Sequence, residues 1–169
     1  VSRGLGDVYK RQPLAGPVYA AAVILPDGAD ICGLDDSKKL SAKQREAVRG
    51  RILETALDSA VAFATVEEIE SLNILGASLL AMRRAVEALR IRPSLLLIDG
   101  NVARGFAEPA VAVIGGDAKY PSVAAASVLA KTARDAYCIE ADAQYPQYGF
   151  AQHKGYGTKA HRAAILQYG

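Results

Sequence analysis

The sequence predicts an α/β fold, in which helices cover a buried sheet on both sides. The first observation is the apolar run 95–98, which ends directly in Asp99 and Gly100. An unbroken apolar run of this length is typical of a strand buried on both faces. The second observation is the segment 72–89, where apolar residues recur three or four apart. That spacing indicates a long amphipathic helix. A long helix directly before a buried strand is typical of an α/β fold.

Composition limits the class of protein. The 169 residues are enough for one domain with its own core, and 51% hydrophobic and 22% charged residues are typical of a globular protein. A net charge of +2 permits a polyanionic partner without requiring one. No apolar run reaches the ~20 residues of a membrane span and no signal peptide is recognisable, so we expect a cytoplasmic location. Cys32 and Cys138 match no metal spacing and are expected to be free core thiols.

Three further segments are strand candidates. Residues 18–25 form the clearest one, which a turn at Asp27-Gly28 ends. Residues 60–64 and 111–114 are shorter candidates. Residues 1–12, by contrast, show no usable period and predict no element.

Three of the expected helices follow a recognisable start. Ser41 with Gln44, and Thr65 with Glu68, have the spacing of capping boxes, and Pro121 suits a first helical turn. The helix 121–136 is rich in small residues that allow close packing on a sheet, and a last helix is expected over 159–167. The apolar faces are expected to comprise Val48, Ile52, Leu53 and Leu57 in the first helix, and Leu75, Leu79, Met82, Val86 and Leu89 in the second.

Two acidic residues lie where apolar runs meet glycines. Asp99 follows the run 95–98, and Asp117 follows Gly115-Gly116 just before the helix at Pro121. Ligand sites in open α/β sheets favour strand ends, and Mg²⁺ or Mn²⁺ prefers carboxylate oxygens there. Asp99-Gly100 alone would also be an ordinary turn signal. The second acid makes a metal site the better interpretation.

Two segments are candidates for binding an anionic substrate. Lys38 and Lys39 precede a helix start, where free N–H groups favour phosphate, although basic pairs in loops are usually only solvated. Residues 145–158 interleave aromatic and basic side chains, including Tyr156 and Lys154, which could stack on sugars and hold phosphates. An aromatic cluster under a loop is the other interpretation. His153 and His161, eight apart, lack the spacing of a helical zinc pair.

Several stretches together resemble the type 2 ribonucleases H, specifically bacterial ribonuclease HII. Their order and spacing hold from Pro13 to the end of the chain, and the set is specific although each piece alone is weak. The matching stretches are Pro13-Leu14-Ala15-Gly16-Pro17-Val18, Asp36-Ser37-Lys38-Lys39-Leu40-Ser41, Asn73-Ile74-Leu75, Ile98-Asp99-Gly100-Asn101, the run 116–135, Tyr148-Gly149-Phe150 and the run 153–161.

The resemblance implies a ribonuclease H-like fold with a mixed sheet of about five strands. It implies an endonuclease that cuts the RNA strand of RNA–DNA hybrids and also cuts at single ribonucleotides in duplex DNA. The family uses four carboxylates and two divalent ions, Mg²⁺ or Mn²⁺. Asp99 and Asp117 match the third and fourth carboxylates, and Asp7 the first. Tyr156 matches the tyrosine that stacks on the sugar beside the scissile junction; Arg11, Lys38, Lys39 and Lys154 are the other expected substrate contacts.

Residues 1–12 depart from the family pattern. Val8 replaces the second carboxylate, and Lys10 and Gln12 replace glycines that let the backbone approach the ribose 2′-OH. The break before Pro13 is abrupt, which is more typical of an artefact joined to a genuine gene than of divergence. We therefore expect a non-family start over 1–12 and a catalytic domain over 13–169. The family usually continues past the last helix, so Gly169 is a candidate truncated end.

This exact chain is expected to be an impaired monomeric enzyme. The alternatives are a catalytically inactive RNA–DNA hybrid-binding protein, favoured by Val8, and a different metal-dependent phosphodiesterase, which the Tyr156 loop disfavours.

Overall fold

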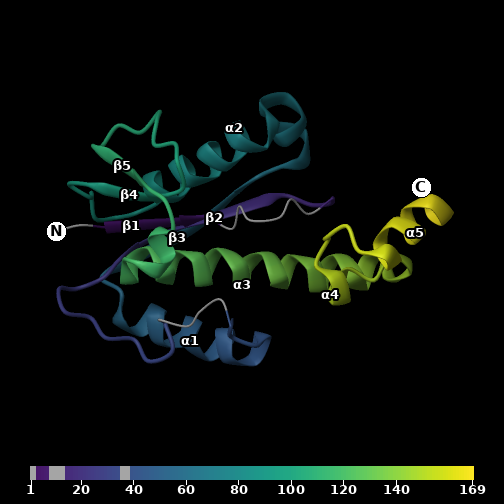
Figure 1. The fold of residues 1–169 in the computed structure, drawn as a ribbon, viewed down its shortest axis with the longest axis horizontal. Helices are drawn as coiled ribbons and strands as arrows, with labels where there is room; N and C mark the ends of the chain where they lie inside the picture. Colours follow the sequence, from purple (N-terminus) through teal and green to yellow (C-terminus); the bar gives the residue numbers. More distant parts are fainter. Residues whose placement is uncertain (1–2, 8–13, 35–38) are drawn as a thin grey trace.

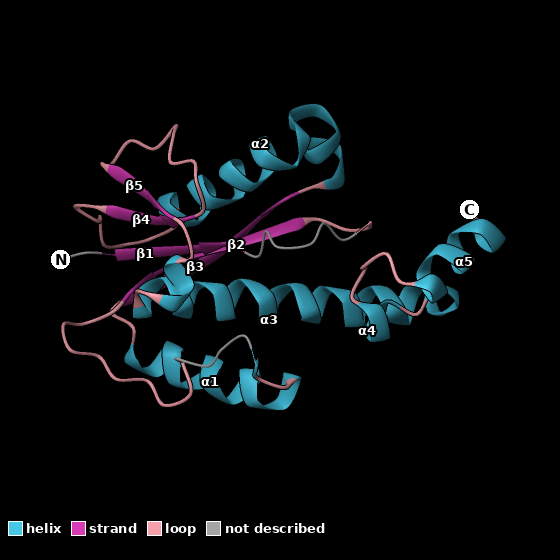
Figure 2. Ribbon diagram, viewed as in Figure 1, coloured by secondary structure: helices cyan, strands magenta, loops and turns pink. Residues whose placement is uncertain are grey.

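The computed structural model describes residues 3–7, 14–34 and 39–169, with only the backbone described at 3–7. Its centre is one five-stranded sheet in the order β3-β2-β1-β4-β5 (Figure 2). The predictions of an α/β fold and of a mixed sheet of about five strands are confirmed. The strands are β1 (Arg3–Asp7), β2 (Val18–Ile24), β3 (Asp58–Ala64), β4 (Leu96–Asp99) and β5 (Ala110–Val113).

The direction of the strands determines which ends share an edge. β2 runs antiparallel to both β1 and β3, whereas β1, β4 and β5 run parallel to one another. Leu5 is paired with Ile98, and Asp99 with Val113. The carboxyl ends of β1, β4 and β5 therefore lie at one edge of the sheet.

Helices cover both faces of the sheet (Figure 1). α2 lies on one face, and α1 and α3 lie on the other. α4 and α5 are placed at the carboxyl end of α3. The helices are α1 (Ala42–Thr55), α2 (Val66–Glu87), α3 (Pro121–Gln144), α4 (Phe150–His153) and α5 (Lys159–Tyr168), with short 3₁₀ turns at η2 (Gly116–Ala118) and η3 (Pro146–Tyr148).

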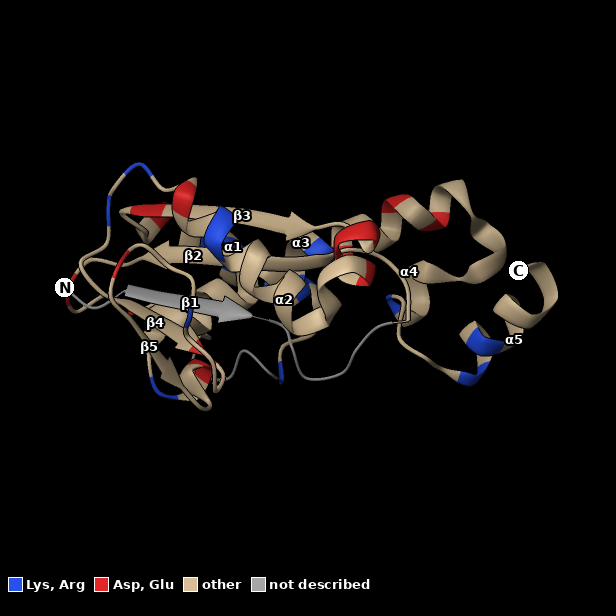
Figure 3. Ribbon diagram, turned by 90° about the horizontal axis from the view of Figure 1, so that it is seen from above, with Lys and Arg blue, Asp and Glu red and all other residues tan. Residues whose placement is uncertain are grey.

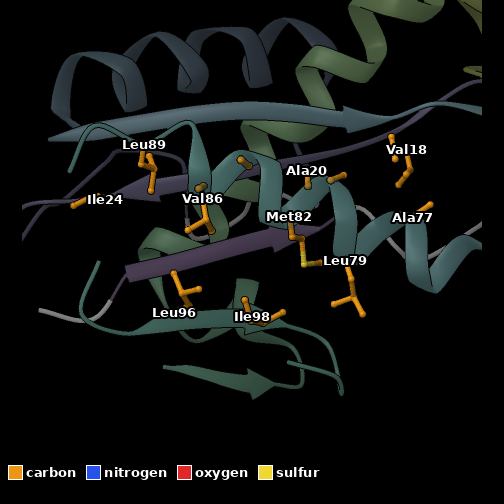
Figure 4. Packing of buried hydrophobic residues seen from close by; sticks show 14 residues of the cluster. Val18, Ala20, Ile24, Ala77, Leu79, Met82, Val86, Leu89, Leu96 and Ile98 are labelled. Carbon is orange, nitrogen blue, oxygen red and sulfur yellow. The ribbon is translucent and has the colours of Figure 1, made fainter. Parts of the chain in front are cut away.

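β2 shows why a continuous apolar run predicts a doubly covered strand. Val18, Ala20 and Ile24 pack against α2, as Figure 4 shows, whereas Ala21 and Val23 pack against α1 and α3. Successive side chains of a strand point to opposite faces, so burial of both faces requires apolar residues at every position. Leu96, Leu97 and Ile98 of β4 are likewise all buried.

Both predicted capping boxes are confirmed. The Ser41 hydroxyl accepts a hydrogen bond from the Gln44 N–H, and the Gln44 side chain accepts one from the Ser41 N–H. Thr65 and Glu68 make the same reciprocal pair at the start of α2. These bonds satisfy backbone donors that a helix start leaves without intrahelical partners.

The central strand is the main difference from the sequence analysis. Residues 3–7, for which no element was predicted, form β1 between β2 and β4. Glycine and aspartate are depleted in strands, so local propensity argues against a strand here, and its two neighbours override that preference. β4, the strand predicted from the apolar run 95–98, lies between β1 and the edge strand β5.

The predicted apolar faces were partly wrong. Leu53 and Leu57 are 46% and 51% exposed, and Leu75 is 37% exposed. Leu75 lies just after Asn73, whose φ of 58° and ψ of 171° interrupt the helical path of α2. Cys32 is also exposed, whereas Cys138 is buried as predicted.

The interruption at Asn73 reverses the chain at the start of α2. Glu68 and Arg84 are sixteen residues apart, which is roughly 24 Å along a straight helix. They nevertheless form a two-point ion pair with N–O distances of 2.6 and 2.7 Å. Helical periodicity alone does not predict this fold-back. Among the described helices, none is both long enough and apolar enough to cross a membrane.

Candidate active site

Asp99 and Asp117 come together at the carboxyl edge of the sheet. Asp99 is the last residue of β4, and its Oδ1 accepts a hydrogen bond from the Gly116 N–H at 2.8 Å. Asp117 is the next residue after Gly116 and lies in η2. Both acids are half-buried. The structure therefore places the two predicted metal-binding carboxylates in adjacent segments, and Figure 3 shows acidic positions together beyond β4 and β5.

Glycines make this approach possible. Gly115 has φ +67°, a left-handed conformation that suits glycine and turns the chain from β5 into η2. A Cβ on Gly116 would lie 3.2 Å from a Val123 methyl and 3.5 Å from the Asp99 carboxylate. The segment before Asp117 thus packs closely against both β4 and α3.

Asp7 reaches the same edge through its backbone. It is the last residue of β1, two residues after Leu5, which is paired with Ile98. The structure describes no side chain for Asp7. The predicted site residues Arg11 and Lys38 lie outside the described residues.

The donors fit a hard divalent cation. Mg²⁺ and similar ions are usually held by one or two carboxylates, with water and substrate phosphate oxygens completing the shell. Asp99 and Asp117 supply two carboxylates from adjacent segments. No group of three or more His, Cys, Asp and Glu side chains gathers in the part of the chain that the structure describes. A metal here would therefore need oxygens from the substrate, water or Asp7.

Tyr156 lies in the loop between α4 and α5, beside the middle of α3. Its backbone carbonyl accepts hydrogen bonds from His161 Nδ1 at 2.9 Å and from the Thr158 N–H at 2.7 Å. His161 is only 1% exposed. Lys131 Nζ of α3 lies 6.0 Å from the centroid of the half-buried Tyr156 ring. The backbone of Tyr156 is thus firmly held while part of its ring faces solvent.

The other aromatic residues of this region pack together. Tyr148 stacks on Phe150 with centroids 5.5 Å apart, and His153 stacks on His161 at 4.1 Å. His153 Nδ1 accepts from the Gly155 N–H, so its Nε2 donates to the Tyr148 carbonyl. For these residues the aromatic-cluster interpretation is confirmed.

The two remaining predicted lysines lie in different places. Lys154 is half-buried in the Tyr156 loop, with φ 52°, and Lys39 is exposed just before the start of α1. Lys39 precedes the capping residue Ser41 by two positions, as predicted. The structure does not bring these two lysines into one described cluster.

One face of α3 carries three charged residues, Lys131, Arg134 and Asp135, to which the sequence analysis gave no role. Arg45 of α1 donates to Asp135 at 2.9 Å and to the Leu40 carbonyl at 3.0 Å. Lys131 lies 3.4 Å from the same Asp135. Arg134 is 6% exposed and donates to carbonyls of two loops. Ala126, Ala130, Arg134 and Cys138 recur every four residues on α3, and the structure buries all four.

The fold and the two carboxylates define a ribonuclease H-like hydrolase that depends on a divalent metal. The family model described as Ribonuclease HII matches residues 11–169, so the chain belongs to the ribonuclease HII family. Members are metal-dependent endoribonucleases that act on RNA–DNA hybrids, and this chain is an enzyme of that kind.

Curated relatives agree with this assignment, and a solved structure agrees with the fold. Ribonuclease HII of Albidiferax ferrireducens is 57% identical over 94% of this chain and 77% of its own length. That of Polaromonas sp. is 55% identical over 94% of this chain and 80% of its own length. The crystal structure of ribonuclease H2 from Pyrococcus horikoshii superposes with a TM-score of 0.82, at 24% identity, covering 98% of this chain and 85% of that one.

Proposed function

We propose that this chain cuts the RNA strand of RNA–DNA hybrids, and cuts at single ribonucleotides in duplex DNA, with Asp99 and Asp117 as ligands of Mg²⁺ or Mn²⁺. The observation that carries the proposal is the 2.8 Å bond between Asp99 and Gly116, which holds the segment of Asp117 against the end of β4. Asp7, at the end of the parallel neighbour β1, is the proposed third ligand.

Each residue has a separate task in this mechanism. A divalent metal bound here would activate water and stabilise the leaving 3′ oxygen. Asp99 and Asp117 hold negative charge at the site, and Tyr156 stacks on the sugar beside the scissile junction. Arg11, Lys38, Lys39 and Lys154 are proposed to contact the substrate, the lysines through phosphates. These charges act on a polyanion, so binding should weaken as salt is raised.

We propose further that residues 1–12 are a non-family start in which residues 8–12 impair the enzyme, and that residues 13–169 are the catalytic domain, whose sheet β1 completes. The family match begins at residue 11, which supports a non-family start. Val8 lacks the carboxylate oxygen that a metal could use. Lys10 adds a positive charge that opposes cation binding, and Lys10 and Gln12 obstruct the approach to the 2′-OH.

Three chains test this account. They are the unmodified chain, its Val8→Glu variant, and a restored chain with Glu-Val-Gly-Arg-Gly at residues 8–12. Cleavage of a duplex with one ribonucleotide is measured at fixed salt with Mg²⁺, with Mn²⁺ and with neither. We expect very slow cleavage by the unmodified chain, partial recovery in Val8→Glu and near-complete recovery in the restored chain. An unmodified chain as fast as the restored chain would overturn the proposed role of residues 8–12.

Tyr156→Ala tests the stacking role in the restored chain. Loss of a nucleotide–aromatic stack costs roughly 1–3 kcal/mol, so cleavage of the single-ribonucleotide duplex should fall about tenfold or more. The loss should be greater for that duplex than for a continuous hybrid. Unchanged cleavage would return Tyr156 to the aromatic-cluster interpretation.

Val8 supports a second candidate, a protein that binds hybrids without cutting them. In that case the unmodified chain would bind a hybrid about as tightly as the restored chain does, but would not cleave it. We also propose that the protein acts as a monomer in the cytoplasm. Analytical ultracentrifugation with and without a hybrid duplex tests the monomer.

A further inference from the structure

Arg134 is a buried arginine that joins two loops. It lies on α3, is 6% exposed, and its Nη2 donates to the carbonyl oxygens of Ala15 at 3.1 Å and Lys154 at 3.0 Å. Ala15 belongs to the loop that leads from residues 8–13 into β2. Lys154 is two residues before Tyr156. One guanidinium therefore connects the segment that follows the 2′-OH-reading region with the Tyr156 loop.

The two loops also contact each other directly. The Leu14 N–H donates to the Gly155 carbonyl at 2.7 Å. A Cβ on Gly157 would lie 3.0 Å from the Leu14 side chain, and one on Gly16 would lie 3.0 Å from the Tyr137 ring. The loops are thus packed on each other and on α3, and Arg134 of α3 contacts both of them.

The chemistry of Arg134 is unusual for a residue that only fills space. Burying a charge is costly unless it is paired, and an apolar side chain would pack at this position without that cost. Within the described residues Arg134 makes no ion pair with a carboxylate, and its Nη1 is buried without a hydrogen-bond partner. The guanidinium donates hydrogen bonds from Nη2 to two carbonyl oxygens that belong to separate loops. An apolar residue or a short amide would not make both bonds.

We propose that Arg134 is a positioning residue for ribonucleotide recognition, because it holds the loop at 14–16 and the loop at 153–157 as one unit. The inference rests on the proposed stacking role of Tyr156. Arg134 does not itself contact substrate in this account. It sets where the Tyr156 ring lies relative to the loop at 14–16.

Hydrogen exchange tests the structural half of this proposal on the unmodified chain, without substrate. In Arg134→Met we expect the amides of Leu14, Tyr156 and Thr158 to exchange about tenfold faster or more, because two charge-assisted bonds are lost. The amides of β2 should keep their rates. Arg134→Lys keeps the charge and one compact donor, so its exchange should be intermediate.

Arg51→Met is the matched control, because Arg51 also donates to a backbone carbonyl, that of Cys32 at 3.0 Å, but far from these loops. It should leave exchange at 14–16 and 153–157 unchanged. Equal exchange of these loops in Arg134→Met and in the unmodified chain would overturn the proposal. If Arg134→Met does not fold, Arg134→Lys decides the same question.

A double-variant cycle tests the functional half. Binding of the restored chain to a single-ribonucleotide duplex and to an all-DNA duplex of the same sequence is measured by fluorescence anisotropy in EDTA, so that no cleavage occurs. Arg134→Met and Tyr156→Ala should each lower the preference for the ribonucleotide about tenfold. The double variant should bind no worse than Tyr156→Ala, because both changes remove the same contact.

The possible outcomes are distinguishable. Additive losses would show that Arg134 does not act through Tyr156 and would overturn the positioning role. If Tyr156→Ala alone changes nothing, the proposed role of Tyr156 fails, and with it the recognition role of Arg134. The exchange experiment would then still decide whether Arg134 holds the two loops together.

Discussion

The Oδ1 of Asp99 accepts a hydrogen bond from the Gly116 N–H across 2.8 Å, which joins the end of β4 to the residue before Asp117. These two residues are seventeen positions apart in the chain. The spacing between the two proposed metal ligands therefore depends on how closely the Gly116 backbone can approach β4.

Gly116→Ala is predicted to disturb this spacing. The added Cβ would lie 3.2 Å from a Val123 methyl, so overpacking should lower the free energy of unfolding by about 1 kcal/mol. The affinity for Mn²⁺ should fall as well, which a metal titration followed by calorimetry would measure. Gly50→Ala is the matched control, because a Cβ there meets nothing within 4 Å. In a helix interior that change should stabilise by roughly 0.5–1 kcal/mol without altering metal affinity.

Asp135→Asn tests the ion network on α3. Asp135 receives Arg45 at 2.9 Å and lies 3.4 Å from Lys131, and its side chain is only 15% exposed. Loss of a hydrogen bond between charged groups costs about 1.5–3 kcal/mol. The free energy of unfolding, measured by urea denaturation, should fall by an amount of that order. Arg45→Met and the double variant complete the cycle. If the double variant loses the sum of the two single losses, the pair is not coupled and the network has no energetic role.

Glu68 predicts how stability changes with acid. The Arg84 guanidinium and the Thr65 N–H lower the pKa of Glu68 from its ordinary 4.5 to about 2. Because the pKa is lower in the folded state, the unfolded state takes up its proton first as pH falls. The stabilisation is complete above 4.5 and is lost between 4.5 and about 2.

The melting temperature of the unmodified chain and of Glu68→Gln measures this effect. The difference between them should shrink as pH is lowered from 5 to 2. Glu46→Gln is the control, since the Glu46–Arg49 pair is exposed and exposed pairs contribute little. A difference for Glu68→Gln that stays constant from pH 5 to pH 2 would show that the ion pair with Arg84 does not form in solution.

Strong local signals made much of the fold predictable. The strand at Val18 and both capping boxes were found because apolar runs and cap residues determine structure locally. β1 was missed because its place depends on two neighbouring strands rather than on its own residues. Leu75 was misplaced because the conformation of Asn73 interrupts the helical period.

The candidate site divides in the same way. Asp99 and Asp117 were recognisable because each follows an apolar run and a glycine lies beside it. Arg134 was not, because its partners are backbone carbonyls of Ala15 and Lys154, which are 119 and 20 residues away. A contact with a backbone carbonyl does not depend on the partner's side chain, so it leaves no motif in the sequence.

The most direct test of the metal site is Asp99→Asn in the restored chain. Asparagine keeps an oxygen for the Gly116 N–H and removes the charge, so the variant should fold at least as stably, since repulsion between neighbouring acids is relieved. Cleavage of a duplex with one ribonucleotide is measured with Mg²⁺ and with Mn²⁺. We predict that Asp99→Asn abolishes metal-dependent cleavage. Cleavage by this variant at the rate of the restored chain would contradict the assignment of Asp99 to the metal site.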